Sequence, residues 1–345
     1  MAVEMDQSVK PAPAPVKKRV FSGVQPTGHI HIGNYLGAIR NWANEQQNYD
    51  NIFCIVDLHA ITVLPIDPKE LHFNTRKLAA LYIACGLDTR YCKLFVQSHV
   101  RQHAEASWIM ECFAPLGWLQ RMTQFKAKAA EEHVDSVSTG LLCYPALMAC
   151  DILLYQTHYV PVGDDQRQHL EFTRDLAQRF NSMYGEQVFT IPEPQIRTVG
   201  ARIMALDDPE KKMSKSDPLD FSRINLLDDA KTIKKKIARA TTDSERLVKF
   251  DEKRPGITNL LTIYQSLTGQ AQEEIEAEFE GKGYGDFKAA LTDQIVAVLE
   301  PIQRRYRELI NDLPALESVL KQGADEARPM AEATLRRIKD VVGLG

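Results

Sequence analysis

Apolar residues follow two alternating patterns along this 345-residue chain between residue 19 and about residue 162. Short continuous apolar runs at 20–22, 52–56, 94–96 and 158–162 are typical of strands that are buried on both faces. Between these runs, apolar residues at helical spacing predict helices over 33–46, 68–85, 104–114 and 139–155. Strands that alternate with helices in this way indicate an α/β fold with a parallel, doubly wound sheet.

The pattern changes after residue 216, where only helices are predicted. They cover 228–240 with Asp228 as N-cap, then 259–267, 271–279, 287–310 and 315–342. We therefore expect a disordered tail over 1–18, a Rossmann-like domain over 19–216 and a second, all-helical lobe over 217–310. The last helix, within 311–345, is long and amphipathic enough to pack back on the first domain.

Composition narrows the possible partners and locations. With 44% hydrophobic residues, 26% charged residues and a net charge of -4, the chain has a sizeable core but no overall basic charge. An RNA partner would therefore need a local basic patch. Six cysteines without a C-x-x-C pair predict free, reduced thiols and a cytoplasmic location. No apolar stretch is long enough to cross a membrane, so no membrane partner is expected.

The first strand runs into a glycine-rich turn and then a helix. The segment 21–34 reads FSGVQPTGHIHIGN, with glycines at 23, 28 and 33 that allow a ligand to approach the backbone. A helix N-terminus attracts phosphate through its free N–H groups, and His31 and Asn34 can add hydrogen bonds there. An ordinary loop-to-helix turn has the same general features, so the segment alone leaves both interpretations open.

A second polar segment, 212–216, reads KMSKS and follows the run GARIM at 200–204. Taken alone it is a solvated basic loop, as most lysine-rich segments are. Together, the two segments resemble the HIGH and KMSKS signatures of class I aminoacyl-tRNA synthetases, with Asn34 in place of the last histidine of HIGH. Their order and their separation by a doubly wound pattern favour this interpretation over two unrelated loops.

Most of residues 19–343 also resembles bacterial-type tryptophanyl-tRNA synthetases, through the stretches 55–62, 121–126, 144–155 and 160–166. The resemblance implies an enzyme that activates L-tryptophan with ATP and then transfers it to tRNA(Trp). It implies an ATP site formed by Gln25, Thr27, Gly28, His31, Gly33, Asn34, Gly163, Asp165, Ile203, Lys212, Met213, Ser214, Lys215 and Ser216. Lys128, Lys212 and Lys215 are the expected catalytic residues, as cations beside the leaving pyrophosphate.

No cluster of aspartates indicates a metal site in the protein. Because the reaction uses ATP, we expect Mg²⁺ to be bound mainly through the phosphates of the nucleotide.

Asp151 lies inside a helix that is otherwise apolar nearly all round, where a carboxylate is costly without partners. The residues alone allow an acceptor for an indole N–H, or a structural aspartate paired with a helix end or a lysine. The resemblance favours the first, with Tyr144 and Gln166 at the ammonium and carboxylate end of tryptophan. It implies that the rest of the tryptophan site is formed by Phe21, Gln25, Val56, His59, Met148, Val160 and Val162, although composition alone would place most of these apolar residues in the core.

One basic stripe occurs in the helical lobe. Lys231, Lys235 and Arg239 recur at i, i+4 and i+8, with Lys234 and Lys236 beside them and two isoleucines, at 233 and 237, on the opposite face. This helix is either a tRNA-phosphate contact or an ordinary solvated face. The resemblance places anticodon recognition in this lobe, and it implies a homodimer.

Three alternatives remain open at this point. A tyrosyl-tRNA synthetase of the same fold is disfavoured because the block 144–166 follows the tryptophan pattern. A synthetase-like RNA- or nucleotide-binding protein without catalysis is disfavoured by the intact His31, Lys212 and Lys215. A nucleotidyltransferase with a HIGH-type turn would lack the helical lobe.

Overall fold

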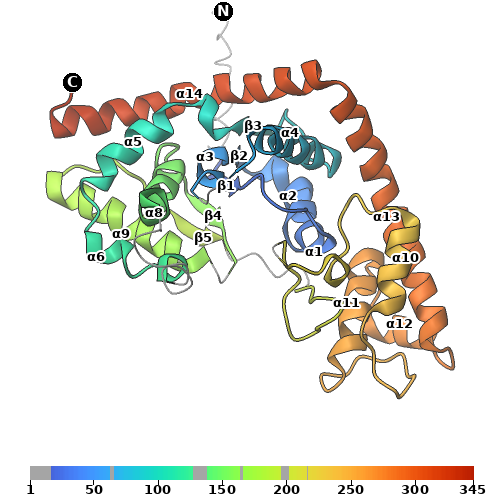
Figure 1. Cartoon of the computed structure of the whole chain (residues 1–345). Helices are drawn as coiled ribbons and strands as arrows, with labels where there is room; N and C mark the ends of the chain where they lie inside the picture. Colours follow the sequence, from blue (N-terminus) through green and yellow to red (C-terminus); the bar gives the residue numbers. More distant parts are fainter. Residues whose placement is uncertain (1–16, 63–65, 127–137, 164–165, 196–201, 216) are drawn as a thin grey trace, which may run out of the picture.

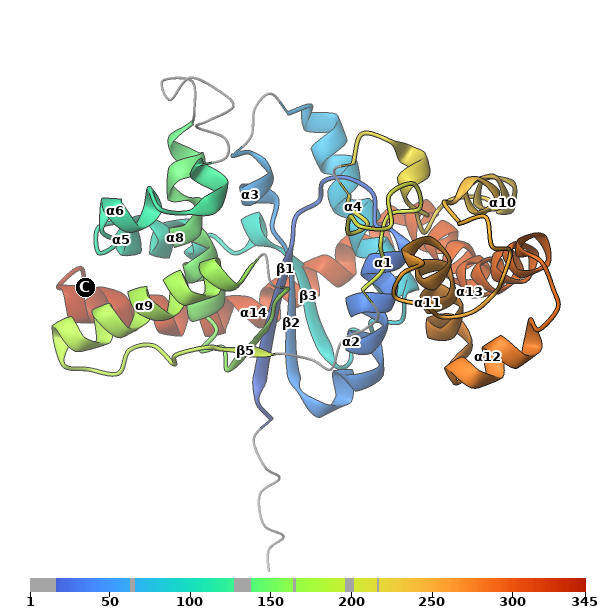
Figure 2. The ribbon, with the colours of Figure 1, turned by 90° about the horizontal axis from the view of Figure 1, so that it is seen from below.

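The computed structural model describes residues 17–62, 66–126, 138–163, 166–195, 202–215 and 217–345. Its centre is a parallel five-stranded sheet (Figure 2). The strand order is β3-β2-β1-β4-β5. The strands are β1 (Arg19–Val24), β2 (Asp50–Ile55), β3 (Cys92–Val96), β4 (Tyr159–Pro161) and β5 (Glu193–Gln195). The first four confirm the predicted strands. The sequence did not predict β5, because its residues Glu-Pro-Gln carry no apolar signal.

The two faces of the sheet are buried in two different hydrophobic cores. Along β2, Phe53 and Ile55 belong to one core, whereas Ile52 and Cys54 belong to the other. Side chains alternate between the two faces of a strand, so a strand covered on both sides reads as a continuous apolar run. The doubly wound α/β class, with its Rossmann-like sheet, is therefore confirmed.

Helices cover both faces. On one face lie α2 (Arg40–Glu45) and α4 (Pro68–Ala84), and on the other lie α5 (Gln102–Glu111), α8 (Thr139–Leu153) and α9 (Arg167–Tyr184). Three short helices, α1 (Ile32–Asn34), α3 (Asp57–Ala60) and α6 (Leu116–Leu119), follow turns. The helix predicted over 33–46 is interrupted by a π-helical segment over 35–39. Helix α9 was not predicted, although its buried residues recur at helical spacing, as Leu170, Phe172, Leu176, Ala177 and Phe180.

The remaining helices are α10 (Ala230–Arg239), α11 (Pro255–Thr268), α12 (Gln272–Glu278), α13 (Tyr284–Asn311) and α14 (Leu313–Val342). The first four gather at one end of the molecule, where α13 packs against α4 (Figure 1). The predicted N-cap of α10 is wrong by one residue. Asp229, not Asp228, accepts the hydrogen bond from the backbone N–H of Thr232, at 2.7 Å. Asp228 instead pairs with Lys236.

The long helix α14 runs back along β3 and contacts α4 and α5 (Figure 1). Its N-terminal part belongs to one core, through Leu316 and Leu320, and its C-terminal part to the other, through Leu335 and Ile338. The domain limits at 216 and 310 remain predictions. No helix within the described ranges is long and apolar enough to span a membrane. All six cysteines are free, although Cys112 is exposed.

Gly323 lets α14 approach the sheet closely. A Cβ atom at this position would stand 2.1 Å from the carbonyl oxygen of Leu94 in β3. We expect Gly323→Ala to lower the free energy of unfolding by about 2 kcal/mol, because the helix must move away from the strand. Gly285→Ala is the matched control, since a Cβ there meets nothing within 4 Å. Urea denaturation checks this, and equal effects of the two changes would contradict the close packing.

Candidate active site

The glycine-rich turn after β1 is held in place by a distant segment of the chain. The backbone N–H of Ile32 donates to the carbonyl of Ile224 at 2.8 Å, and that of Leu226 donates to the carbonyl of Ile30 at 2.9 Å. His31 is the N-cap of α1, and its backbone N–H donates to Oδ1 of Asn34 at 3.2 Å. A Cβ at Gly33 would stand only 3.0 Å from the His31 ring, so a larger residue would press against that ring.

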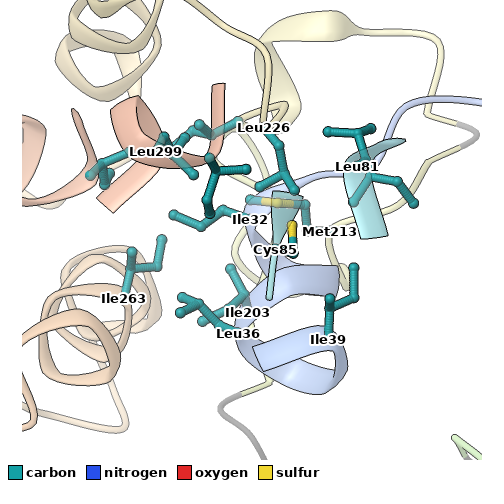
Figure 3. Packing of buried hydrophobic residues seen from close by; sticks show 14 of the residues in the cluster. Ile32, Leu36, Ile39, Leu81, Cys85, Ile203, Met213, Leu226, Ile263 and Leu299 are labelled. Atoms are coloured by element: carbon teal, nitrogen blue, oxygen red, sulfur yellow. The ribbon is translucent and has the colours of Figure 1, made fainter. Parts of the chain in front are cut away.

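The KMSKS segment lies against this turn. Gly28 has a φ of +67°, and a Cβ there would stand 3.2 Å from Cβ of Lys215. Met213 is buried, and its N–H donates to the carbonyl of Ile203 at 3.1 Å. Figure 3 shows the Met213 and Ile203 side chains packed with Ile32 and Leu36 of the turn's helical segment. The two signatures, about 180 residues apart in the sequence, therefore meet in space.

Positive charge gathers around His31. Burial, followed by the charges of Lys215, Arg223 and Lys212, lowers the pKa of His31 to about 3, so its ring is neutral at pH 7. Burial also lowers the pKa of Lys215 to about 8. Cations beside a helix N-terminus and a neutral imidazole form a surface that is suited to an anionic ligand such as a polyphosphate.

A cavity of about 390 Å³ opens beside the turn. It lies beyond the ends of β1 and β2, where ligands bind in parallel doubly wound sheets. Its volume is within the range of small-molecule sites. The residues that line it come from the turn, from α3 and the segment after it, from residue 124 and from α8: Gln25, Thr27, His59, Ala60, Thr62, Ile66, Gln124, Leu141 and Tyr144.

Asp151 is buried behind this cavity, with an exposed fraction of 1%. His59 contacts its Oδ2 at 2.7 Å, while Gln97 and His103 each contact Oδ1 at 2.6 Å. Burial alone would raise the pKa of Asp151, but the hydrogen bonds from His103 and His59 outweigh it and lower the pKa to about 2. Asp151 is thus a charged acceptor, and its partners are two histidines and a glutamine rather than a helix end or a lysine.

Three of the residues predicted to bind tryptophan line the cavity, and the others are placed around it in the fold or in the core. Gln25, His59 and Tyr144 line the cavity. Tyr144 also contacts His169 through its hydroxyl, and burial raises the pKa of Tyr144 to about 12. Gln166 is the N-cap of α9. The predicted apolar residues belong to the hydrophobic core on the α8 side of the sheet, or pack against that core. They are Phe21, Val56, Met148, Val160 and Val162.

The predicted ATP residues fall into three groups. Gln25, Thr27, Gly28, His31, Gly33, Asn34, Ile203, Lys212, Met213 and Lys215 belong to the turn and the KMSKS loop described above. Gly163 is exposed just beyond β4, and Ser214 is half-buried. Lys128, Asp165 and Ser216 lie outside the described residues, so their predicted roles have no structural account.

The basic stripe on α10 is present, with one correction. Lys231, Lys235 and Arg239 are exposed, and the isoleucines at 233 and 237 are buried as predicted. Lys236, which the sequence placed beside the stripe, is only 5% exposed. It contacts Asp220 at 2.8 Å and Asp228 at 2.7 Å, because burial of an ammonium group requires a counter-charge.

Sequence reasoning assigned no role to three residues around Asp151, namely Gln97, His103 and Tyr155. Gln97 stands directly after β3, and a polar residue at the carboxyl end of a parallel strand is a signal that could have identified it. His103 and Tyr155 occur within helical patterns that gave no such signal. Within the described part of the chain, no three histidines, cysteines or carboxylates are grouped so that they could hold a metal ion.

Comparisons with known proteins find similar sequences along nearly the whole chain. The family described as class I tRNA synthetases for tryptophan and tyrosine matches residues 16–300. The tryptophan–tRNA ligase of Wolinella succinogenes is 56% identical over 329 residues, which cover 95% of this chain and 99% of that protein.

Two solved structures agree with this match. The tryptophanyl-tRNA synthetase of Mycoplasma pneumoniae has a TM-score of 0.86 at 40% identity, over 96% of this chain and 99% of that chain. The Campylobacter jejuni enzyme, complexed with ADP and tryptophan, has a TM-score of 0.83 at 35% identity, over 94% of this chain and 100% of that chain.

Proposed function

Because this chain belongs to the class I tRNA synthetase family for tryptophan and tyrosine, we propose that it is a tryptophan–tRNA ligase. It activates L-tryptophan with ATP to give tryptophanyl-adenylate and pyrophosphate, and it then transfers the tryptophan to tRNA(Trp). The observation that carries this proposal is the contact of Lys215 with Gly28, which joins the two phosphate-binding signatures beside a cavity backed by a buried, charged Asp151.

The chemistry needs no side-chain nucleophile. The tryptophan carboxylate attacks the α-phosphate of ATP, the bond to the β,γ-pyrophosphate breaks, and negative charge builds on the leaving group. Lys212 and Lys215, together with Lys128, stabilise that charge, and the N–H groups at the start of α1 hold the phosphates. Catalysis is therefore positioning combined with charge stabilisation. Mg²⁺ enters with ATP and is bound mainly through its phosphates.

Tryptophan occupies the cavity, with its indole N–H directed to Asp151. Tyr144 and Gln166 hold its ammonium and carboxylate groups, and Gln25 and His59 complete the polar wall. The flat slot around the ring is formed by Phe21, Val56, Met148, Val160 and Val162. An amino acid without a ring donor leaves the charged Asp151 one partner short, which disfavours its binding.

Amino-acid-dependent exchange of pyrophosphate into ATP tests this proposal. Tryptophan should stimulate exchange and tyrosine should not. Stimulation by tyrosine alone would support a tyrosyl-tRNA synthetase, and stimulation by neither would support a non-catalytic relative.

The pKa of Lys215 predicts an alkaline limb in the rate profile. Its folded-state pKa of about 8 lies below the ordinary value of 10.5, so the free enzyme loses this cation as the pH rises through 8. We expect kcat/KM for ATP to fall by up to roughly tenfold per pH unit above that point. In Lys215→Arg the guanidinium stays charged, so the limb should move to higher pH. A limb at the same pH in both proteins would contradict this assignment.

The exposed face of α10 is the proposed contact with tRNA(Trp). Lys231, Lys235 and Arg239 point away from the buried isoleucines and can neutralise backbone phosphates. Binding of a tRNA(Trp) transcript should therefore weaken with rising salt, and less steeply in a triple alanine variant. An unchanged salt slope would leave α10 as an ordinary solvated face.

We also propose that the protein is a cytoplasmic homodimer. On the neighbouring helices α5 and α6, Trp108 is 70% exposed and Leu116 is 57% exposed, and aromatic residues such as Trp108 are enriched at protein interfaces. We expect the wild-type protein to run as a dimer in light scattering at micromolar concentration, and Trp108→Asp to run as a monomer. Leu344→Asp, at another exposed leucine, is the control. A wild-type monomer would contradict the proposed state.

A further inference from the structure

Asp151 is held by a network that extends beyond the cavity. His103 is completely buried, with Nδ1 at 2.6 Å from Oδ1 of Asp151 and Nε2 at 2.8 Å from the hydroxyl of Tyr155. Tyr155 is also completely buried, and its ring stacks on Phe21 with a centroid distance of 5.8 Å. Tyr155 and His103 therefore form a fixed chain of contacts behind the carboxylate.

The charge on Asp151 sets the direction of the hydrogen bond from His103. An ionised carboxylate only accepts, so Nδ1 of His103 donates to Oδ1. Nε2 of the same ring lies 2.8 Å from the hydroxyl oxygen of Tyr155. Burial raises the pKa of Tyr155, so this hydroxyl keeps its proton. The network thus runs from Tyr155 through His103 to Asp151.

The network leaves one acceptor position on Asp151. A carboxylate accepts about four hydrogen bonds, two on each oxygen. Gln97 and His103 fill Oδ1, while His59 is the one described residue that contacts Oδ2. His59 lines the cavity, so the oxygen with the unused position is the one bonded to a cavity residue. Gln97 is itself fixed, because its Oε1 accepts the backbone N–H of Leu58 at 3.1 Å.

We propose that His103 and Tyr155 are positioning residues that make the enzyme select an amino acid with a ring N–H. This inference rests on the proposed function, since it requires tryptophan in the cavity. His103 holds Oδ1 directly, and Tyr155 holds the ring of His103 in place. Together they prevent the carboxylate of Asp151 from rotating. Oδ2 is then left with one unused acceptor position, which the indole N–H of tryptophan fills.

The test compares two substrates that differ only at the donor. L-tryptophan and 3-(3-benzothienyl)-L-alanine have nearly the same shape, but a sulfur atom replaces the N–H in the second. Pyrophosphate exchange gives kcat/KM for each, and their ratio measures the contribution of the N–H. A general weakening of the site lowers both values and leaves the ratio unchanged, so the ratio separates positioning from a merely structural role.

Three variants disturb the network to different extents. Tyr155→Phe removes only the hydroxyl, and we expect it to lower the ratio by about tenfold through the loss of one hydrogen bond behind His103. His103→Leu removes the donor to Oδ1 and should lower the ratio by roughly a hundredfold. His103→Asn keeps an amide donor near the place of Nδ1 and should retain a ratio closer to the wild type. Tyr82→Phe is the control, since Tyr82 is a buried tyrosine in the other core.

The outcomes separate this inference from the proposed function. If the wild type discriminates but Tyr155→Phe and His103→Leu keep its ratio, His103 and Tyr155 are only structural and the inference is wrong. If the wild type shows no tryptophan-dependent exchange, the proposed function itself fails. Because Tyr155→Phe preserves the packed ring, the test does not depend on whether His103→Leu folds.

Discussion

Lys215→Ala is expected to lower kcat for tryptophan-dependent pyrophosphate exchange by roughly 10²- to 10³-fold, as the loss of one preorganised donor to a developing charge does in other enzymes. The KM for tryptophan should change little, because Lys215 lies against Gly28 in the glycine-rich turn rather than in the wall of the cavity. Steady-state exchange at saturating ATP measures both constants.

A neighbouring lysine gives a matched control for this change. Lys211 precedes the same loop and forms an ion pair with Asp208 at 3.2 Å, with 75% of its side chain exposed. An exposed ion pair of this kind contributes little, so Lys211→Ala should keep wild-type kcat. Similar losses in the two variants would mean that the loop acts through its overall charge, and Lys215 would lose its specific role.

Asp151→Asn should reduce kcat/KM for tryptophan by roughly 10²- to 10³-fold while the KM for ATP stays within about twofold. Three donors converge on this side chain, and an amide offers only one oxygen to them. Its NH₂ group would therefore face at least one donor, and the charged acceptor for the indole N–H would be lost. Separate titrations of tryptophan and ATP in the exchange assay measure the two effects.

Asp50→Asn is the control for this second change. Asp50 also carries two partners, Arg19 and Lys93, but it stands at the amino end of β2, away from the cavity. It should lower stability without changing the KM for tryptophan. Equal losses of tryptophan and ATP affinity in Asp151→Asn would count against its assigned role.

The sheet was predictable because its central strands are buried on both faces. Alternate residues of β2 enter two cores, so the strand stands out as an unbroken apolar run. The edge strand β5 could not be found in this way, since its three residues are polar or proline. The N-cap of α10 was ambiguous for a different reason. Asp228 and Asp229 are equally good caps by type, and only the contact of Asp228 with Lys236 decides between them.

The site was predictable where short segments carry its chemistry, and less so where the fold assembles it. The turn at Gly28 and the loop at Lys215 can each be recognised from a short sequence motif, and the structure brings them together. The environment of Asp151 is different, because Gln97 and His103 come from other elements about 50 residues away. A buried carboxylate in an apolar helix predicts that partners exist, but single-sequence spacing cannot identify them.

Aminoacylation of purified tRNA(Trp) transcript tests the central claim most directly, because it requires ATP activation, tryptophan selection and tRNA recognition together. With radiolabelled tryptophan and ATP, the protein should esterify tryptophan to tRNA(Trp) and should leave tRNA(Tyr) uncharged with tyrosine. Charging of tRNA(Tyr) with tyrosine, or no charging of tRNA(Trp) by a folded protein, would contradict the account.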